Sequence, residues 1–172
     1  MKRVLIVGAE STGKTTLAMA LAEHYQTTWV PEFGRLYTEA RRPRGDLWRS
    51  DEFTFIATEQ VRMEDALERI ANRVLICDTD AFATAIWHER YLEQPSPEVL
   101  AVAAGRTYDL YILTDVDTPF VSDDIRDGET IREWMHNRFQ EELSRMRAPV
   151  LFVSGPHEQR MAAAIARIDS LL

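Results

Sequence analysis

Residues 8–16 read GAESTGKTT, and this stretch decides the fold of the chain. An apolar run at 4–7 precedes it and another at 17–22 follows it, as expected for a strand before the loop and a helix after it. We interpret the stretch as a P-loop, which surrounds the phosphates of a nucleotide with backbone N–H groups. It matches the pattern G-x-x-x-x-G-K-[ST], whose fixed positions are Gly8, Gly13, Lys14 and Thr15.

Each residue type in the loop has a part in holding phosphates. Glycine allows backbone conformations that are closed to other residues, so that successive N–H groups can point inward. Lys14 can reach the β- and γ-phosphates of ATP, and the hydroxyl of Thr15 can bind Mg²⁺. We therefore expect ATP and Mg²⁺ as cofactors. The residues expected to bind the nucleotide are Gly8, Glu10, Ser11, Thr12, Gly13, Lys14, Thr15 and Thr16.

The composition limits the class of protein. With 172 residues and 45% hydrophobic content, the chain can form one well-buried domain, and we expect a single domain over 1–172. It has no run of about 18 apolar residues and no basic-then-apolar leader, so we expect neither a membrane span nor export. The lone cysteine, Cys77, fits a reducing cytoplasm. A net charge of −8 argues against a nucleic-acid partner.

Short apolar runs alternate with amphipathic segments along the chain. This alternation predicts an α/β fold with a five-stranded parallel sheet covered by helices on both faces. We expect Ser50 or Asp51 to cap the long third helix. The expected strands are 4–7, 28–30, 74–77, 110–113 and 150–153. The expected helices are 14–25, 34–42, 51–72, 81–91, 97–104, 129–146 and 158–171.

Ligands of such sheets collect beyond the carboxyl ends of the strands. Asp78 ends the third apolar run, which is the position of a Walker B aspartate, and we expect it to hold Mg²⁺ beside Thr15. Asp80 is as much a candidate for a helix cap as for a substrate contact. The other candidates at this edge are Glu10 to Thr15, Glu32, Arg35, Thr114, Asp115 and Gly155.

Glu32 is the candidate general base. A carboxylate across the cleft from the P-loop could take the proton from an acceptor hydroxyl as that hydroxyl attacks the γ-phosphate. The alternatives are a solvated loop glutamate or a partner for Arg35, and Asp78 is a rival for the role of base. The spacing of these residues in the sequence does not show which of these roles Glu32 and Asp78 have.

The acidic and polar segment 115–128 is typical of a lid. Arg126, with Arg132 on the following helix, could neutralise the migrating phosphoryl group while the lid excludes water. A solvated surface loop with salt-bridged arginines is the alternative. We expect Lys14, Glu32, Asp78 and Arg126 to be catalytic, and Arg126 and Arg132 to contact the nucleotide.

Six aromatic residues lie near the same edge of the expected sheet. At least half of them should belong to the core. An acidic cleft with exposed rings would suit a flat, positively charged substrate. The six are Trp29, Phe33, Tyr37, Phe82, Trp87 and Tyr91, and the residues expected to contact the substrate are Glu32, Arg35, Tyr37, Asp80 and Trp87.

Four stretches in this order resemble the kinase domain of the NadR-type NAD-salvage proteins, the ribosylnicotinamide kinases. They are GAESTGKTT at 8–16, PEFGRLYT at 31–38, ANRVLICDTD at 71–80 and DTPFVSDDIR at 117–126. The resemblance implies a P-loop kinase with strand order 2-3-1-4-5 and a lid. It also implies transfer of phosphate from ATP to the 5′-hydroxyl of nicotinamide riboside, which gives nicotinamide mononucleotide. That acceptor is itself a flat cation.

The resemblance leaves several points open. The family's proteins carry an adenylyltransferase domain, and some a DNA-binding domain, ahead of the kinase. Here Met1 lies two residues from the first expected strand, so we carry neither activity over. Asp124 stands where the family usually has glycine, which adds a negative charge to the lid. A kinase for another nucleoside or small alcohol, and an ATP-hydrolysing switch, remain alternatives. A homo-oligomer and a separate adenylyltransferase remain open as partners.

Overall fold

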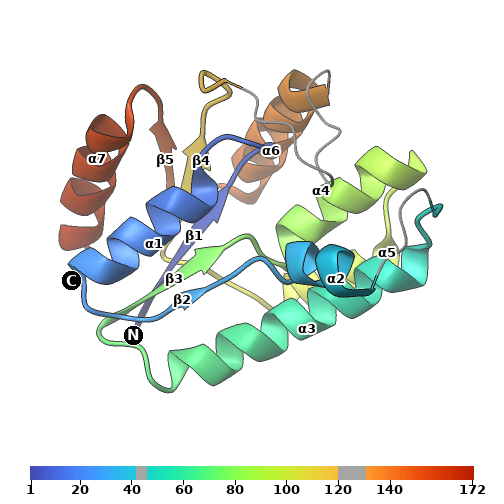
Figure 1. Cartoon of the computed structure of the whole chain (residues 1–172), viewed down its shortest axis with the longest axis horizontal. Helices are drawn as coiled ribbons and strands as arrows, with labels where there is room; N and C mark the ends of the chain where they lie inside the picture. The colour runs from blue at the N-terminus through green and yellow to red at the C-terminus, as the bar shows by residue number, and fades with distance from the viewer. Residues whose placement is uncertain (42–45, 120–130) are drawn as a thin grey trace.

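A five-stranded parallel sheet forms the centre of the computed structural model of this chain, which describes residues 1–41, 46–119 and 131–172 (Figure 1). The strand order is β2-β3-β1-β4-β5, as the family resemblance implied. All four neighbouring pairs are parallel. The P-loop therefore follows the central strand. The strands are β1 (Lys2–Val7), β2 (Trp29–Val30), β3 (Val74–Asp78), β4 (Leu110–Thr114) and β5 (Val150–Val153).

Helices cover both faces of the sheet, as predicted (Figure 1). One face packs against α1 (Lys14–His24) and α7 (His157–Asp169), and the other packs against α3, α4 and α6. None of the helices in the described ranges is long and apolar enough to cross a membrane. The remaining helices are α2 (Phe33–Arg41), α3 (Ser50–Glu68), α4 (Ala81–Leu92), α5 (Pro97–Ala104) and α6 (Arg132–Met146).

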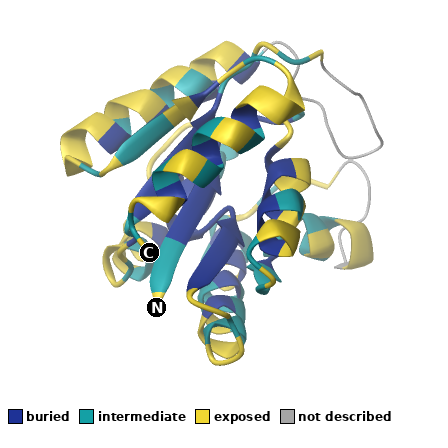
Figure 2. Ribbon diagram, turned by 90° about the vertical axis from the view of Figure 1, so that its left-hand side faces the viewer, coloured by how far each residue is buried: buried dark blue, intermediate teal, exposed yellow. Residues whose placement is uncertain are grey.

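The central strand shows why the core has two halves. Side chains of a strand point alternately to opposite faces, so Val4 and Ile6 pack with α1 and α7, while Leu5 and Val7 pack on the α4 and α6 side. All four are completely buried. In Figure 2 the central strands are mostly dark blue and lie between helices whose outer faces are yellow. Burying each such side chain stabilises the fold by roughly 1.5–3 kcal/mol.

The start of α3 corrects a prediction. Neither Ser50 nor Asp51 caps the helix; Arg49 occupies the N-cap position, and its backbone N–H donates to the Glu52 carboxylate over 2.8 Å. The hydroxyl of Ser50 instead lies 2.8 Å from Nε2 of His88. The Glu52 carboxylate thus accepts the backbone N–H of the N-cap residue, which is the glutamate half of a capping box.

The end of α3 also differs from the prediction, which extended the helix to residue 72. The helix ends at Glu68. The backbone N–H of Asn72 donates to Thr27 Oγ1 over 2.8 Å, which turns the chain toward β3. Elsewhere the predicted and observed bounds agree within a few residues, and α5 and β5 agree at both ends.

Candidate functional site

The P-loop lies between the end of β1 and the start of α1. Gly8 has φ +149°, and a Cβ there would come within 2.2 Å of Thr114 Oγ1. Gly13 has φ +82° at the N-cap position of α1. Both conformations are ones that residues with a side chain rarely adopt, so the geometry accounts for the two glycines of the motif.

Side chains within the P-loop fold back on its own backbone. The carbonyl of Ala9 accepts hydrogen bonds from Thr12 Oγ1 at 2.8 Å and from Lys14 Nζ at 2.7 Å. Thr12 Oγ1 also lies 2.7 Å from Thr114 Oγ1 at the end of β4. Lys14 is buried, and its ammonium is held over the loop by a neutral carbonyl. A phosphate oxygen would be a stronger acceptor for that ammonium, because the hydrogen bond would be charge-assisted on both sides.

Thr15 and Asp78 meet at the carboxyl edge of the sheet, as predicted. Thr15 Oγ1 donates to Asp78 Oδ2 over 2.5 Å. Asp78 Oδ1 is buried and has no hydrogen-bond partner in the described part of the chain. Burial raises the pKa of Asp78, and the nearby Lys14 opposes that rise. A hydroxyl, a carboxylate and one unused carboxylate oxygen fit Mg²⁺, which binds one or two protein oxygens together with waters and phosphates.

Glu32 follows β2, and β2 pairs with β3, so Glu32 lies near Asp78. The residue is half-buried, and the burial of its carboxyl group raises the pKa to about 7. Lys14 attracts the ionised form, while Asp78 and Glu10 repel it. A carboxyl group that titrates near neutral pH can accept a proton during a reaction and release it afterwards.

Three of the five substrate residues predicted from the sequence, Arg35, Tyr37 and Asp80, form hydrogen bonds within the protein. Arg35 Nε donates to Glu39 over 2.9 Å, and the Tyr37 hydroxyl donates to Glu52 over 3.0 Å. Asp80 is the N-cap of α4, where its Oδ1 accepts from the Ala83 N–H over 2.9 Å. This geometry favours the cap reading of Asp80.

An aromatic cluster joins α2, α3 and α4. Tyr37 lies 5.8 Å from Phe55 and 6.5 Å from Trp48, measured between ring centroids. Trp48 in turn lies 5.4 Å from Tyr91, which stacks on Trp87 at 6.2 Å. The sequence reading did not single out Trp48, Phe53 and Phe55, which line this cluster with Phe33.

Four of the six predicted aromatic residues lie in the core or pack against it, which confirms the expectation of at least half. Phe82 is buried, with its ring 6.0 Å from that of Phe139. Trp29 packs partly buried against the α1 and α7 side of the sheet. Trp87 and Tyr91 also pack partly buried against the core, and they belong to the aromatic cluster together with Phe33 and Tyr37.

The arginines near the P-loop are placed as follows. Arg132 is buried; its Nη2 donates to the Thr118 carbonyl over 2.8 Å and lies 3.5 Å from the Ser11 carbonyl. Arg126 and most of the predicted lid lie outside the described residues. Arg90 was not predicted: its Nη1 lies 2.8 Å from Oε1 of Glu10, and both side chains are buried. The ion pair fastens the P-loop to α4.

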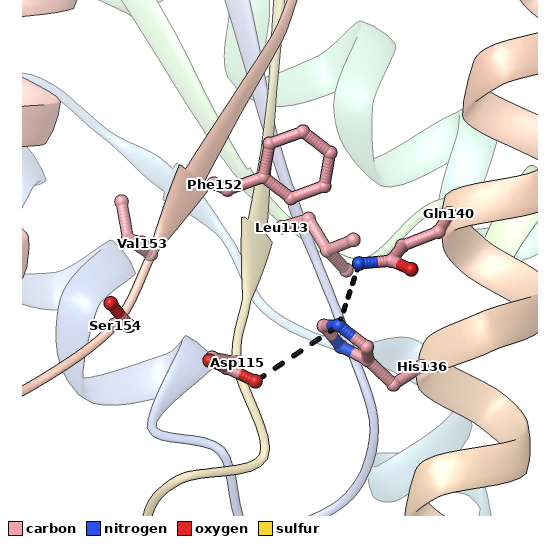
Figure 3. A pocket seen from close by; sticks show the side chains of 7 residues that line it. All are labelled: Leu113, Asp115, His136, Gln140, Phe152, Val153 and Ser154. Atoms are coloured by element: carbon pink, nitrogen blue, oxygen red, sulfur yellow. Dashed lines mark hydrogen bonds and ion pairs between the residues drawn. The ribbon is translucent and has the colours of Figure 1, made fainter.

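A cavity of about 200 Å³ lies beside the P-loop strand, between α6 and the ends of β4 and β5 (Figure 3). His136 Nε2 is 3.0 Å from Gln140 Nε2 and 4.0 Å from Asp115 Oδ1. Figure 3 shows these side chains below the ring of Phe152. The cavity is lined by Leu113, Asp115, His136, Gln140, Phe152, Val153 and Ser154, and so contains no P-loop residue.

Comparisons with known proteins show what this chain is similar to. A family model described as an AAA domain matches residues 3–160. Two curated proteins named trifunctional NAD biosynthesis/regulator protein NadR, from Salmonella typhimurium and Escherichia coli, are 32% identical to the chain over 127 residues. The match covers 73% of this chain and 31% of each relative, so the chain spans about a third of their length.

Solved structures share the fold. The crystal structure of NadR protein in complex with NR has a TM-score of 0.76 at 26% identity and covers 98% of this chain and 51% of that one. NadR in complex with NAD and AMP-PNP has a TM-score of 0.77 at 21% identity, with 96% and 49% covered. Thymidylate kinase from Candida albicans has a TM-score of 0.67 at 12% identity, with 99% and 92% covered. At these identities the last two likenesses support the fold alone.

Proposed function

This chain belongs to the AAA domain family, and from that premise we propose that it is an ATP-dependent kinase for nicotinamide riboside. It transfers the γ-phosphoryl group to the 5′-hydroxyl, which yields nicotinamide mononucleotide and ADP. The proposal rests mainly on one observation. Lys14, the Thr15–Asp78 pair and Glu32 lie together at the carboxyl edge of the sheet. The identity to NadR, and the NadR structure in complex with NR, support the choice of acceptor.

The nucleotide side of the site uses the P-loop. The N–H groups of residues 8–16 and the ammonium of Lys14 hold the phosphates. Thr15 and Asp78 would hold Mg²⁺, which neutralises charge on the phosphate oxygens when bound. Arg126 and Arg132 complete the proposed set by stabilising charge on the migrating group.

On the acceptor side, Glu32 is the proposed base. The 5′-oxygen forms a bond to the γ-phosphorus as the bond from that phosphorus to the β,γ-bridging oxygen breaks, and the hydroxyl proton passes to the Glu32 carboxylate. A cationic nicotinamide ring suits this acidic side of the cleft, with Tyr37 and Trp87 as stacking partners. Arg35 and Asp80 complete the proposed acceptor contacts, Asp80 through Oδ2, which has no partner in the described part of the chain while Oδ1 caps α4. Asp78 remains the rival base, since its pKa is raised as well.

The experiment that tests the proposal is a panel of nucleosides with Mg²⁺ and ATP, followed by the mass of the product. We expect nicotinamide mononucleotide and ADP in equal amounts. Phosphorylation of another nucleoside alone would replace the acceptor but keep the kinase. ATP hydrolysis that no nucleoside stimulates would favour a regulatory switch and overturn the proposal.

The proposal also covers where in the cell the protein acts and which partner proteins it has. The activity is placed in the cytoplasm, as a chain with a single cysteine suggests. A separate adenylyltransferase, which would turn the product into NAD, remains open as a partner. A homo-oligomer remains open and is tested by the mass of the protein in solution.

A further inference from the structure

Arg160, on α7, connects three loops at the carboxyl edge of the sheet. Its Nη1 donates to the Thr12 carbonyl in the P-loop over 2.7 Å, and its Nε donates to the Gly155 carbonyl over 2.8 Å. Its Nη2 forms an ion pair with Asp117, the residue that follows the end of β4 by three positions. The side chain is only 4% exposed. The guanidinium is therefore held by three acceptors that come from separate segments.

The hydrogen bond to Thr12 fixes the direction of one peptide unit of the P-loop. A trans peptide is planar, and its C=O and N–H point in opposite directions. The described part of the chain has no cis peptide bond. Because Arg160 holds the Thr12 carbonyl on the outside of the loop, the N–H of Gly13 in the same peptide must point to the inside. That is where a phosphate would accept it.

The preceding peptide is oriented in the same way. The Ser11 carbonyl accepts a hydrogen bond of 2.8 Å from Thr118 Oγ1, so the N–H of Thr12 also points inward. Asp117 and Thr118 are neighbours in sequence, and both act on the outer side of the P-loop. Thr118 contacts the loop directly, whereas Asp117 acts through its ion pair with Arg160. The Ser11 and Thr12 carbonyls are thus both held by side chains from outside the loop.

We propose that Arg160 is a positioning residue for nucleotide binding, which acts by holding the Gly13 N–H toward the phosphates. The inference rests on the proposed function, because it assumes that the P-loop binds a nucleotide. Asp117 keeps Arg160 in place: one carboxylate oxygen pairs with the guanidinium and the other accepts the Gly155 N–H. A buried arginine needs such a partner, since an unpaired buried charge is costly.

A purely structural role is the competing explanation. Helix α7 packs on the sheet through Ala164 and Ile168, which are completely buried, so α7 has apolar contacts of its own. If Arg160 only tied α7 to the domain, its loss would lower stability and weaken all ligands together. If it orients the Gly13 N–H, its loss weakens the nucleotide and spares the nucleoside.

The test measures the two ligands separately by calorimetry, with Mg²⁺ and AMP-PNP in one titration and nicotinamide riboside in the other. For Arg160→Ala we expect the AMP-PNP Kd to rise about 10- to 100-fold, with riboside affinity within about twofold of wild type. Arg160→Lys should recover part of the loss. Asp117→Asn should show a smaller change of the same sign. Arg167→Ala, on the same helix with its guanidinium on the Ser170 hydroxyl, is the matched control and should bind both ligands as wild type does.

Three outcomes decide the question. If Arg160→Ala binds AMP-PNP as tightly as Arg167→Ala, the proposal is wrong. A parallel loss of both ligands together with thermal stability also overturns it. Should Arg160→Ala fail to fold, the proposal stands only if Arg160→Lys and Asp117→Asn both weaken AMP-PNP while riboside binding is kept. A wild-type protein that binds no AMP-PNP would instead remove the proposed function itself.

Discussion

The hydroxyl of Thr15 donates to Asp78 Oδ2 over 2.5 Å, which joins the start of α1 to the end of β3. The other carboxylate oxygen, Oδ1, is buried without a partner in the described ranges. A buried acceptor left in this state loses the solvation that water would provide. A metal ion bound there would satisfy Asp78 Oδ1. Thr15 and Asp78 would then hold the metal together.

Thr15→Ala should therefore raise the Mg²⁺ concentration needed for half-maximal activity by about 10- to 100-fold, because one oxygen of the pair is lost. The measurement is kinase activity against Mg²⁺ at saturating ATP. Thr58→Ala, which removes a hydroxyl bonded to the Thr54 carbonyl within α3, is the control. An unchanged Mg²⁺ dependence in Thr15→Ala would remove Thr15 from the proposed metal site.

Lys14→Ala should lower turnover by roughly 10²- to 10³-fold, since the ammonium would no longer stabilise charge on the phosphates. Circular dichroism should show an intact fold. The chain has one other lysine, Lys2, which pairs with Asp109 at the surface over 2.8 Å. Lys2→Ala should keep full activity and change stability by at most about 1 kcal/mol. Near-normal turnover in Lys14→Ala would contradict the catalytic role.

Glu32→Gln should lower kcat by about 10²- to 10⁴-fold while leaving the nucleotide Kd unchanged. The wild-type pKa of about 7 gives a pH test. The base works as a carboxylate in the free enzyme, so kcat/KM should fall about tenfold per pH unit below pH 7 and level off above it. Glu23→Gln, an exposed carboxylate on α1, is the control and should keep the wild-type profile. If only Asp78→Asn abolishes the pH dependence, Asp78 is the base.

The sequence could predict those parts of the site that a local motif carries. Gly8, Lys14 and Thr15 lie within one loop, and Asp78 and Glu32 each follow a recognisable strand. Arg90 and Arg160 could not be found in this way, because their contacts join positions 80 and 148 residues apart. The start of α3 was predicted wrongly by one position: Arg49 is the N-cap and Glu52, three residues later, accepts its N–H, which N-cap propensity alone does not show.

Gly8→Ala should destabilise the fold, because φ is +149° there and the added Cβ would lie 2.2 Å from Thr114 Oγ1. We expect a loss of about 1–3 kcal/mol in the free energy of unfolding. Urea denaturation measures it. Gly105→Ala is the matched control: its φ is −77° and the nearest atom to the new Cβ is 3.5 Å away. Equal stability of the two variants would contradict the strain argument.

The buried carboxyl group of Glu64 should make the stability of the protein depend on pH. Glu64 is completely buried, and both its oxygens accept from the Tyr108 hydroxyl, at 3.1 and 3.0 Å. Burial and the neighbouring Asp80 raise the pKa of Glu64 from 4.5 to about 8, while Arg106, 3.7 Å away, and Arg3 lower it. The folded protein therefore keeps a proton on Glu64 that the unfolded chain releases.

Between about pH 5 and 8, the folded protein holds this proton while the unfolded chain has lost it. The free energy of unfolding of the wild-type protein should therefore fall as the pH rises, and Glu64 contributes up to about 1.4 kcal/mol per pH unit to that fall. The stabilisation is fully present below pH 4.5 and is lost by about pH 8, where the folded group also ionises. Glu64→Gln keeps the shape and cannot ionise, so its stability should decline less over the same range. Urea denaturation at several pH values measures the difference. Glu23→Gln should follow the wild-type curve, and a Glu64→Gln curve parallel to wild type would show that Glu64 is already ionised in the folded state.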